Sequence, residues 1–107
     1  MTTIATTPTY HDCDLDAEGF LQKPDQWNDE IASEIARENA IDPLTEKHWQ
    51  VVRFMRDRFL ASGNAPSIRT LGKESGVPIK ELYQLFPKGP AKLAAKIGGI
   101  PKPHGCI

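Results

Sequence analysis

The chain has little cysteine and no long hydrophobic run. Two cysteines stand among 107 residues, and no apolar stretch approaches the ~20 residues of a membrane-spanning helix. These absences argue against a disulfide scaffold and a transmembrane protein. Residues 1–9 have neither a basic start nor an apolar stretch, so we expect no secretory signal and a cytoplasmic protein with free thiols. The length, with 25% charged and 39% hydrophobic residues, suits one soluble globular domain.

The residue patterns of most enzymes are also missing. We expect no metal site and no cofactor, because the cysteines and histidines have no metal-ligand spacing. No glycine-rich loop lies between a strand and a helix, which argues against a phosphate-binding loop of that kind. No Ser/His/Asp set and no pair of carboxylates indicates a catalytic centre.

The net charge of −1 hides a strong asymmetry between the two halves of the chain. Residues 1–46 hold eleven acids against two bases, a charge of −9, whereas residues 47–107 hold eleven bases against three acids, a charge of +8. The acidic half can cover the basic half within the molecule. Alternatively, the basic half stays open for a nucleic acid or an acidic protein partner.

Caps, breakers and apolar spacing predict five helices. One begins after Asn28 and ends before Asp42-Pro43, and the others are expected over residues 45–62, 67–75, 78–86 and 90–98.

The longest predicted helix has two distinct faces. Trp49, Val52 and Phe59 recur at three- and four-residue steps and are expected to enter the core. The charged residues between them are expected to face solvent, namely Arg53, Arg56, Asp57 and Arg58.

The remaining segments complete a mainly α fold. Residues 1–9 are expected to be a disordered lead, and residues 10–21 a small β-hairpin that turns at Ala17-Glu18-Gly19. The folded body then extends over residues 10–97. Three glycines and two prolines among the last ten residues argue against regular structure, so residues 98–107 are expected to be a flexible C-terminal arm.

Residues 68–86 follow the plan of a helix-turn-helix, with Gly76 in the tight turn. A DNA-reading helix offers Arg, Asn, Gln or Lys to base edges, and here only Lys80 and Gln84 qualify. A helix pair that serves as scaffold is therefore the favoured interpretation, and a DNA-binding regulator is the alternative.

Cys106 is the strongest candidate for a functional residue. It lies one residue from the end of the sequence, and an exposed free cysteine is a liability unless its reactivity is used. Lys96 and Lys102, and His104 when protonated, favour its thiolate, whereas the terminal carboxylate opposes it. An accidental surface cysteine is the other interpretation. Cys13 lies among acids and is expected to be inert.

The arm that carries this thiol has the composition of a delivery device. Two prolines stiffen its middle and three glycines leave hinges at its ends: Pro101, Pro103, Gly98, Gly99 and Gly105. Fully extended, the eight residue steps from Gly98 span ~26–29 Å. Such an arm can present sulfur to one partner and then to another.

The ending of the chain is its most specific motif, because a Pro-Lys-Pro-His-Gly-Cys close one residue from the terminus is hard to obtain by chance. Further distinctive segments are residues 16–21, 44–49, 52–54, 66–69 and 82–90, together with Trp27. Through these segments, nearly the whole sequence resembles the DsrC/TusE family of small sulfur-trafficking proteins.

The resemblance implies a small helical domain with an N-terminal hairpin, a helix-turn-helix and a flexible arm, on which Cys106 carries sulfur as a persulfide. It implies an upstream sulfur-donor protein or relay complex, and a downstream thiolation enzyme with tRNA or a sulfite reductase. DsrC-type members have a second arm cysteine at the position of Ala95. This departure favours TusE-like members, which pass sulfur toward 2-thiouridine in tRNA, and leaves a one-thiol partner of sulfite reductase as the alternative.

Four residues are expected to support the thiol and its arm. Lys96 and Lys102 are expected to act as electrostatic helpers of the thiol. Arg69 and Tyr83 are expected to line the surface on which the arm rests. The chain is thus predicted to be a transferase-type carrier rather than a stand-alone catalyst.

Overall fold

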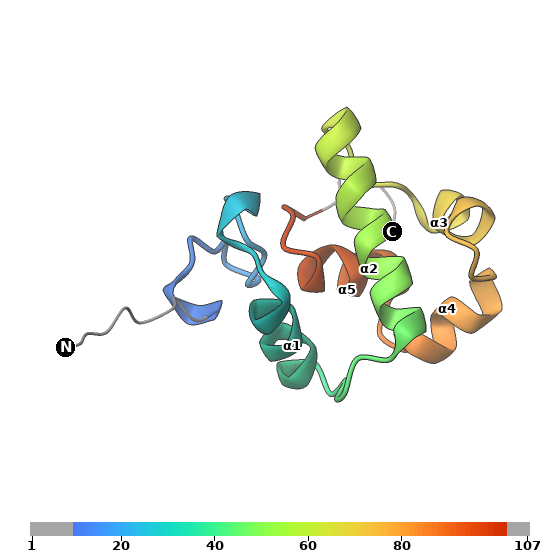
Figure 1. The fold of residues 1–107 in the computed structure, drawn as a ribbon, viewed down its shortest axis with the longest axis horizontal. Coiled ribbons are helices and arrows are strands. Elements are labelled where there is room, and N and C mark those ends of the chain that lie inside the picture. The colour runs from blue at the N-terminus through green and yellow to red at the C-terminus, as the bar shows by residue number, and fades with distance from the viewer. Residues whose placement is uncertain (1–9, 103–107) are drawn as a thin grey trace.

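The computed structural model describes residues 10–102 of the chain, and residues 1–9 and 103–107 lie outside them. The described part contains η1 (Tyr10–Asp12), η2 (Pro24–Gln26), α1 (Asp29–Glu38), α2 (Glu46–Ser62), α3 (Ile68–Glu74), α4 (Ile79–Leu85) and α5 (Pro90–Ile97). Figure 1 shows α1 toward one end of the molecule, the pair α3–α4 at the other end, and α2 and α5 between them. The prediction of a mainly helical fold is confirmed.

The predicted helix caps fix where α1 and α2 begin. The Asn28 side chain accepts a hydrogen bond from the Ile31 N–H at 2.8 Å, and the Thr45 side chain accepts one from the His48 N–H. Each such cap contributes about 1 kcal/mol. Gly63 then ends α2 in the left-handed region, with φ 80°.

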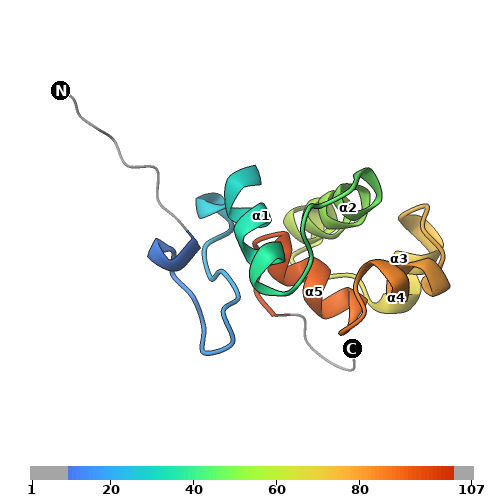
Figure 2. The ribbon, with the colours of Figure 1, turned by 90° about the horizontal axis from the view of Figure 1, so that it is seen from below.

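The helix α5 lies at the centre of the fold. It contacts α1, α2, α3 and α4, and only Lys92 and Lys96 of its residues are not buried. Figure 2 shows α5 in the middle of the molecule, between α1 and α4. Its buried alanines, Ala91, Ala94 and Ala95, have small side chains that let neighbouring helices approach closely.

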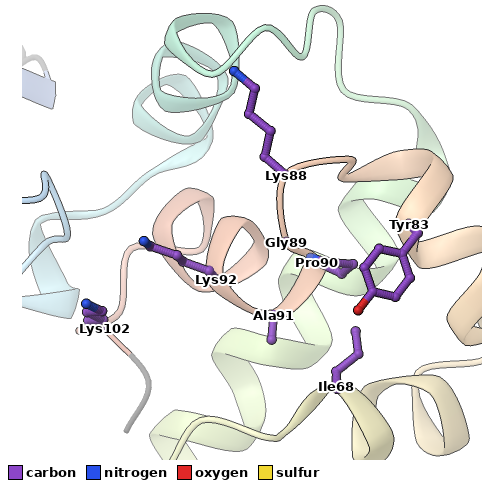
Figure 3. Close-up of a pocket in the computed structure, with 8 residues that line it drawn as sticks. All are labelled: Ile68, Tyr83, Lys88, Gly89, Pro90, Ala91, Lys92 and Lys102. Carbon is purple, nitrogen blue, oxygen red and sulfur yellow. The ribbon is translucent and has the colours of Figure 1, made fainter. Parts of the chain in front are cut away.

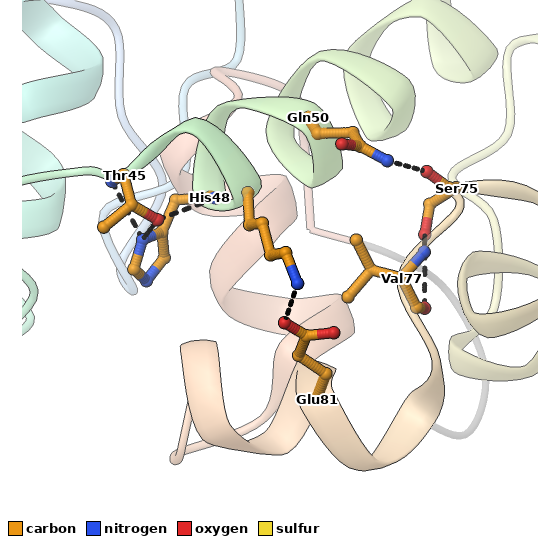
Figure 4. Close-up of polar contacts among 7 residues, drawn as sticks. Thr45, His48, Gln50, Ser75, Val77 and Glu81 are labelled. Atoms are coloured by element: carbon orange, nitrogen blue, oxygen red, sulfur yellow. Dashed lines mark hydrogen bonds and ion pairs between the residues drawn. The ribbon is translucent and has the colours of Figure 1, made fainter.

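The helices α3 and α4 form the predicted helix-turn-helix. Leu71, Val77 and Leu82 are buried, and Gly76 takes the left-handed conformation in the turn, with φ 86°. A polar contact joins this pair to α2, since the Gln50 side chain donates to the Ser75 carbonyl at 2.6 Å (Figure 4). The turn is therefore fixed both by packing and by a hydrogen bond.

His48 ties the start of α2 to the end of α4. Its Nδ1 accepts from the Thr45 backbone N–H at 3.0 Å (Figure 4), so its Nε2 carries the ring proton and donates to the Leu85 carbonyl at 2.9 Å. The ring is buried, and both of its nitrogens are used. One side chain thus caps a helix and positions the helix-turn-helix.

The predicted N-terminal β-hairpin is wrong, because the described residues contain no β-strand. One isolated antiparallel bridge joins Leu15 and Leu21. Between them, Asp16 Oδ1 accepts hydrogen bonds from the Glu18 and Phe20 N–H groups at 2.8 and 2.9 Å. These bonds hold a tight turn, and one of them uses the Phe20 N–H, which a regular ladder would pair with the Asp16 carbonyl.

Candidate functional site

Four predicted site residues lie outside the described residues: Pro103, His104, Gly105 and Cys106. The structure does describe the point where their segment joins the body. We call residues 98–102 the tail root. Its contacts show which part of the predicted arm belongs to the folded body.

The tail root begins as a closed helix end. Gly99 has φ 68°, its N–H donates to the Lys96 carbonyl, and the Ile100 N–H donates to the Ala95 carbonyl, both at 3.2 Å. This pair of bonds is a Schellman motif, which ends a helix at a left-handed glycine. Ile100 is fully buried. The hinge predicted at Gly98 and Gly99 is therefore not formed, and the chain stays packed on the body through Ile100.

Trp27 holds the tail root from the N-terminal side. Its indole N–H donates to the Ile97 carbonyl at 2.7 Å. Its ring lies so close to Gly99 that a Cβ on that residue would come within 2.2 Å of the ring. Only glycine fits at this position, for reasons of both backbone conformation and space.

Arg56 holds the tail root from α2. Its Nη1 donates to the Gly98 carbonyl at 3.0 Å and its Nη2 to the Pro24 carbonyl at 2.9 Å. The guanidinium carbon lies 4.3 Å from the centre of the Trp27 ring, within cation–π range. Burial lowers the pKa of Arg56, and the carbonyls and ring replace lost water. The prediction that Arg56 lies on a solvated face is therefore wrong.

Glu18 fastens the other end of the tail root to the N-terminal turn. It pairs with Lys102 at 2.6 Å and with Lys92 at 3.2 Å. Hydrogen bonds from Lys102 and then Lys92 hold the pKa of Glu18 below its ordinary range. Lys96 points to the same region, with Nζ 5.8 Å from the centre of the Phe20 ring. Both predicted electrostatic helpers thus have partners within the body.

Acidification is expected to release Lys102 from Glu18. Because the folded-state pKa of Glu18 is lowered, the stabilisation is fully present above the ordinary pKa of 4.5 and is lost as pH falls through the folded-state value. In an NMR titration, the Glu18 carboxyl and Lys102 ammonium signals should change together below pH 4.5. In Glu18→Gln, the Lys102 signal should lose this transition. A Glu18 that titrates at or above its ordinary pKa would contradict the contact.

A cavity of about 330 Å³ opens beside the tail root (Figure 3). It is lined by Ile68, Tyr83, Lys88, Gly89, Pro90, Ala91, Lys92 and Lys102. Figure 3 shows the side chains of Tyr83, from α4, and Ile68, from α3, directed toward one another. The structure thus brings Tyr83 and Lys102 to one cavity, whereas Arg69 is exposed and does not line it.

The other thiol of the chain, Cys13, has a protected environment. It is buried, and burial, followed by the nearby carboxylates of Asp12, Asp14 and Glu34, raises its pKa above the ordinary value of 9.0. A thiol of this kind stays protonated at neutral pH and is a poor nucleophile. This environment agrees with the prediction that Cys13 is inert.

Residues 10–102 contain no group of three or more His, Cys, Asp or Glu side chains placed to hold a metal ion. None of their helices is long and apolar enough to cross a membrane.

Comparisons with known proteins agree on one family. The model of the DsrC-like proteins matches residues 8–107. Sulfurtransferase TusE of Escherichia coli strain K12 is 45% identical over 102 residues, covering 88% of this chain and 92% of the relative.

Solved structures give the same result. The oxidized gamma-subunit of the dissimilatory sulfite reductase (DsrC) from Archaeoglobus fulgidus is 41% identical, with a TM-score of 0.74 and coverage of 89% of this chain and 92% of that one. The crystal structure of dissimilatory sulfite reductase I (DsrI) matches at 38% identity and a TM-score of 0.80, covering 89% of this chain and 91% of that one. Because the family model spans almost the whole sequence and the relatives align over most of both chains, this chain belongs to the DsrC-like protein family.

Proposed function

We propose that this chain is a sulfur carrier, which accepts a persulfide on Cys106 and passes it on in a sulfur relay toward 2-thiouridine formation in tRNA. The observation that carries the proposal is the contrast between its thiols. Cys13 is buried with a raised pKa, whereas Cys106 belongs to the short segment that follows a firmly held tail root. The similarity to sulfurtransferase TusE and to DsrC supports sulfur transfer as the chemistry.

The transfer step balances in atoms and electrons. The Cys106 thiolate attacks the terminal sulfur of a donor persulfide, R–S–SH. A new S–S bond forms on Cys106, the donor S–S bond breaks, and the donor leaves as the thiolate R–S⁻, while the proton stays on the transferred sulfur. The same exchange with an acceptor thiolate releases the sulfur. The protein contributes delivery and effective concentration to this exchange, with no external oxidant or reductant.

Ala95 supports a carrier with one reactive thiol. This position matches the second arm cysteine of DsrC-type members, and here it is a fully buried alanine in α5. No second thiol is therefore present in α5 or the segment after it to form an internal disulfide with Cys106. Persulfide exchange needs one cysteine only. The TusE-like role is favoured for this reason, and a one-thiol partner of sulfite reductase is the alternative.

The tail root shortens the distance over which the sulfur can be delivered. Four residue steps separate Lys102 from Cys106, and such a segment spans at most ~13–14 Å. This is about half of the reach expected for an arm that starts at Gly98. A donor or acceptor must therefore bring its sulfur close to the tail root, where the positive charges of Lys102 and Lys96 favour the thiolate of Cys106.

Intact-mass spectrometry tests the proposal. Wild-type protein incubated with glutathione persulfide is expected to gain one sulfur atom and to lose it on treatment with dithiothreitol. Cys106→Ser is expected to gain none, because it lacks the acceptor. Cys13→Ala serves as the matched control and should take up sulfur like the wild type, because the Cys13 thiol is buried.

The proposal fails if Cys106 stays unmodified, or if Cys106→Ser takes up sulfur as readily as the wild type. The same assay tests the residues expected to support the arm. An unchanged rate of sulfur uptake in Arg69→Ala would remove Arg69 from the site, and the corresponding result for Tyr83→Ala would remove Tyr83.

A further inference from the structure

The acidic side chains of the helix pair α3–α4 form ion pairs with α2, whereas three of its basic side chains form no ion pair within residues 10–102. Glu74 pairs with Arg58, and Glu81 pairs with Lys47. Both partners belong to α2, so these acids do not neutralise the outer surface. Three cations of the pair are exposed and form no ion pair with any residue in the described part of the chain: Arg69, Lys73 and Lys80.

The same helix pair also exposes apolar surface. Within the described residues, three large hydrophobic side chains are exposed, and two of them lie on α4: Ile79 is 42% and Tyr83 52% exposed. Their spacing of four residues places them on one side of the helix. We call Arg69, Lys73, Ile79, Lys80 and Tyr83 the α3–α4 surface.

No acidic side chain of residues 10–46 pairs with a cation of this surface. The ion pairs of the acidic half with the basic half run to α2 and to the region around α5: Asp29 with Arg53, and Glu18 with Lys92 and Lys102. Of the two interpretations of the charge asymmetry, internal neutralisation therefore applies to α2 and α5. Within residues 10–102, the cations of the α3–α4 surface have no acidic partner and are available to another molecule.

This surface lies next to the point where the cysteine-bearing segment begins. Tyr83 and Lys102 line the same cavity (Figure 3), and Cys106 is only four residues beyond Lys102. A partner that binds at Tyr83 and extends along this cavity approaches Lys102, from which the segment that follows can span at most ~13–14 Å. Binding there would bring a donor sulfur within reach of the thiol.

We propose that the α3–α4 surface binds an acidic protein surface with an apolar centre, which belongs to the protein that donates sulfur to Cys106. This inference rests on the proposed carrier function. Unpaired cations complement acidic side chains and steer association, while Ile79 and Tyr83 supply the apolar centre that specific protein interfaces have. A nucleic acid is less suited to this surface, because α4 offers only Lys80 and Gln84 as side chains of the kind that read base edges.

Synthetic peptide persulfides test the chemistry of this surface. One peptide combines glutamates with leucines, and a second of equal length contains serine and glycine around the same persulfidated cysteine. Sulfur uptake by Cys106 is followed by mass spectrometry. The acidic, apolar peptide is expected to react about tenfold faster at low salt, and this advantage should shrink at 0.5 M salt, where the Debye length falls to about 4 Å.

Single substitutions with matched controls locate the effect. Lys80→Glu and Ile79→Ala are each expected to lower the rate of sulfur uptake from the acidic, apolar peptide about three- to tenfold. The rate of uptake from the serine–glycine peptide should stay unchanged. Arg37→Glu and Leu60→Ala are the controls, because they change an exposed cation on α1 and an exposed leucine on α2. Both should behave like the wild type.

The outcomes separate this inference from the carrier function. If no persulfide modifies Cys106, the carrier function fails. If Cys106 is modified but the acidic peptide has no advantage, or the controls lose it equally, the proposed surface is wrong. The proposal is also overturned if total tRNA binds the chain, loses binding in Lys80→Glu, and the peptide advantage is unaffected by that substitution.

Discussion

Gly99→Ala is expected to lower the free energy of unfolding by about 3 kcal/mol or more. Gly99 has φ 68°, where an alanine is strained, and its new Cβ would lie 2.2 Å from Cδ1 and 2.5 Å from Cγ of Trp27. The indole cannot move aside without losing its hydrogen bond to the Ile97 carbonyl. Thermal unfolding should therefore shift down by about 10 °C or more, and denaturant titration gives the free energy directly.

Gly63→Ala separates the two causes of this loss. Gly63 has a similar φ of 80°, but no atom lies within 4 Å of the position that its Cβ would take. This variant has backbone strain without a clash, so a loss of about 1 kcal/mol is expected. Equal losses in Gly63→Ala and Gly99→Ala would show that Trp27 does not press on the tail root. In the double variant Trp27→Ala/Gly99→Ala, the loss of stability should be smaller than the sum of the two single losses, because the clash needs both side chains.

Arg56→Ala is expected to cost about 3 kcal/mol of stability. The substitution removes two hydrogen bonds from a charged donor and one cation–π contact with Trp27. It also leaves the carbonyl of buried Gly98 without this donor. Chemical denaturation measures the loss, and hydrogen exchange at the Ile100 amide should accelerate because the tail root opens more often.

Two variants control this result. Arg53→Ala removes an exposed arginine from the same helix, which pairs with Asp29 at 3.6 Å, and should change stability by less than about 1 kcal/mol. Arg56→Lys keeps the charge but lacks the planar fork that reaches two carbonyls, so an intermediate loss is expected. If Arg56→Ala costs no more than Arg53→Ala, Arg56 does not hold the tail root.

The helices were predictable because their signals are local. Asn28 and Thr45 cap the helices that follow them, and Gly63 and Gly76 have positive φ where the sequence places a stop and a turn. Each signal acts within one helical turn of its residue, so no distant contact is needed to interpret it. The buried pattern of the helix-turn-helix follows from the same spacing.

The tail root could not be predicted in this way. A pair of glycines with a proline two residues later is compatible with a hinge and equally with a closed helix end. What decides here is Trp27, whose indole bonds to Ile97 across 70 positions of sequence. The prediction that a flexible arm starts at Gly98 rests on glycine content and does not include the contact with Trp27.

The partial burial of Arg56 is only weakly indicated by its position in the sequence, because a charged residue type ordinarily indicates exposure. Arg56 lies four residues after Val52 and directly after Met55, both fully buried, so its position borders the buried stripe of α2. An arginine at such a position ordinarily faces water, unless acceptors compensate its burial. The two acceptors, Pro24 and Gly98, are distant in sequence. Local patterns therefore could not reveal them.

The uneven placement of charge makes the molecule an electric dipole. Residues 1–46 carry −9 and residues 47–107 carry +8, and Figure 1 places α1 and the pair α3–α4 at opposite ends. A molecule with almost no net charge experiences little net force in the electric field of a partner, but its dipole experiences a torque that orients it. Screening limits this torque to the last ~8 Å of approach at physiological ionic strength. Encounters are thus turned rather than attracted, so that the basic half of the chain meets an acidic partner first.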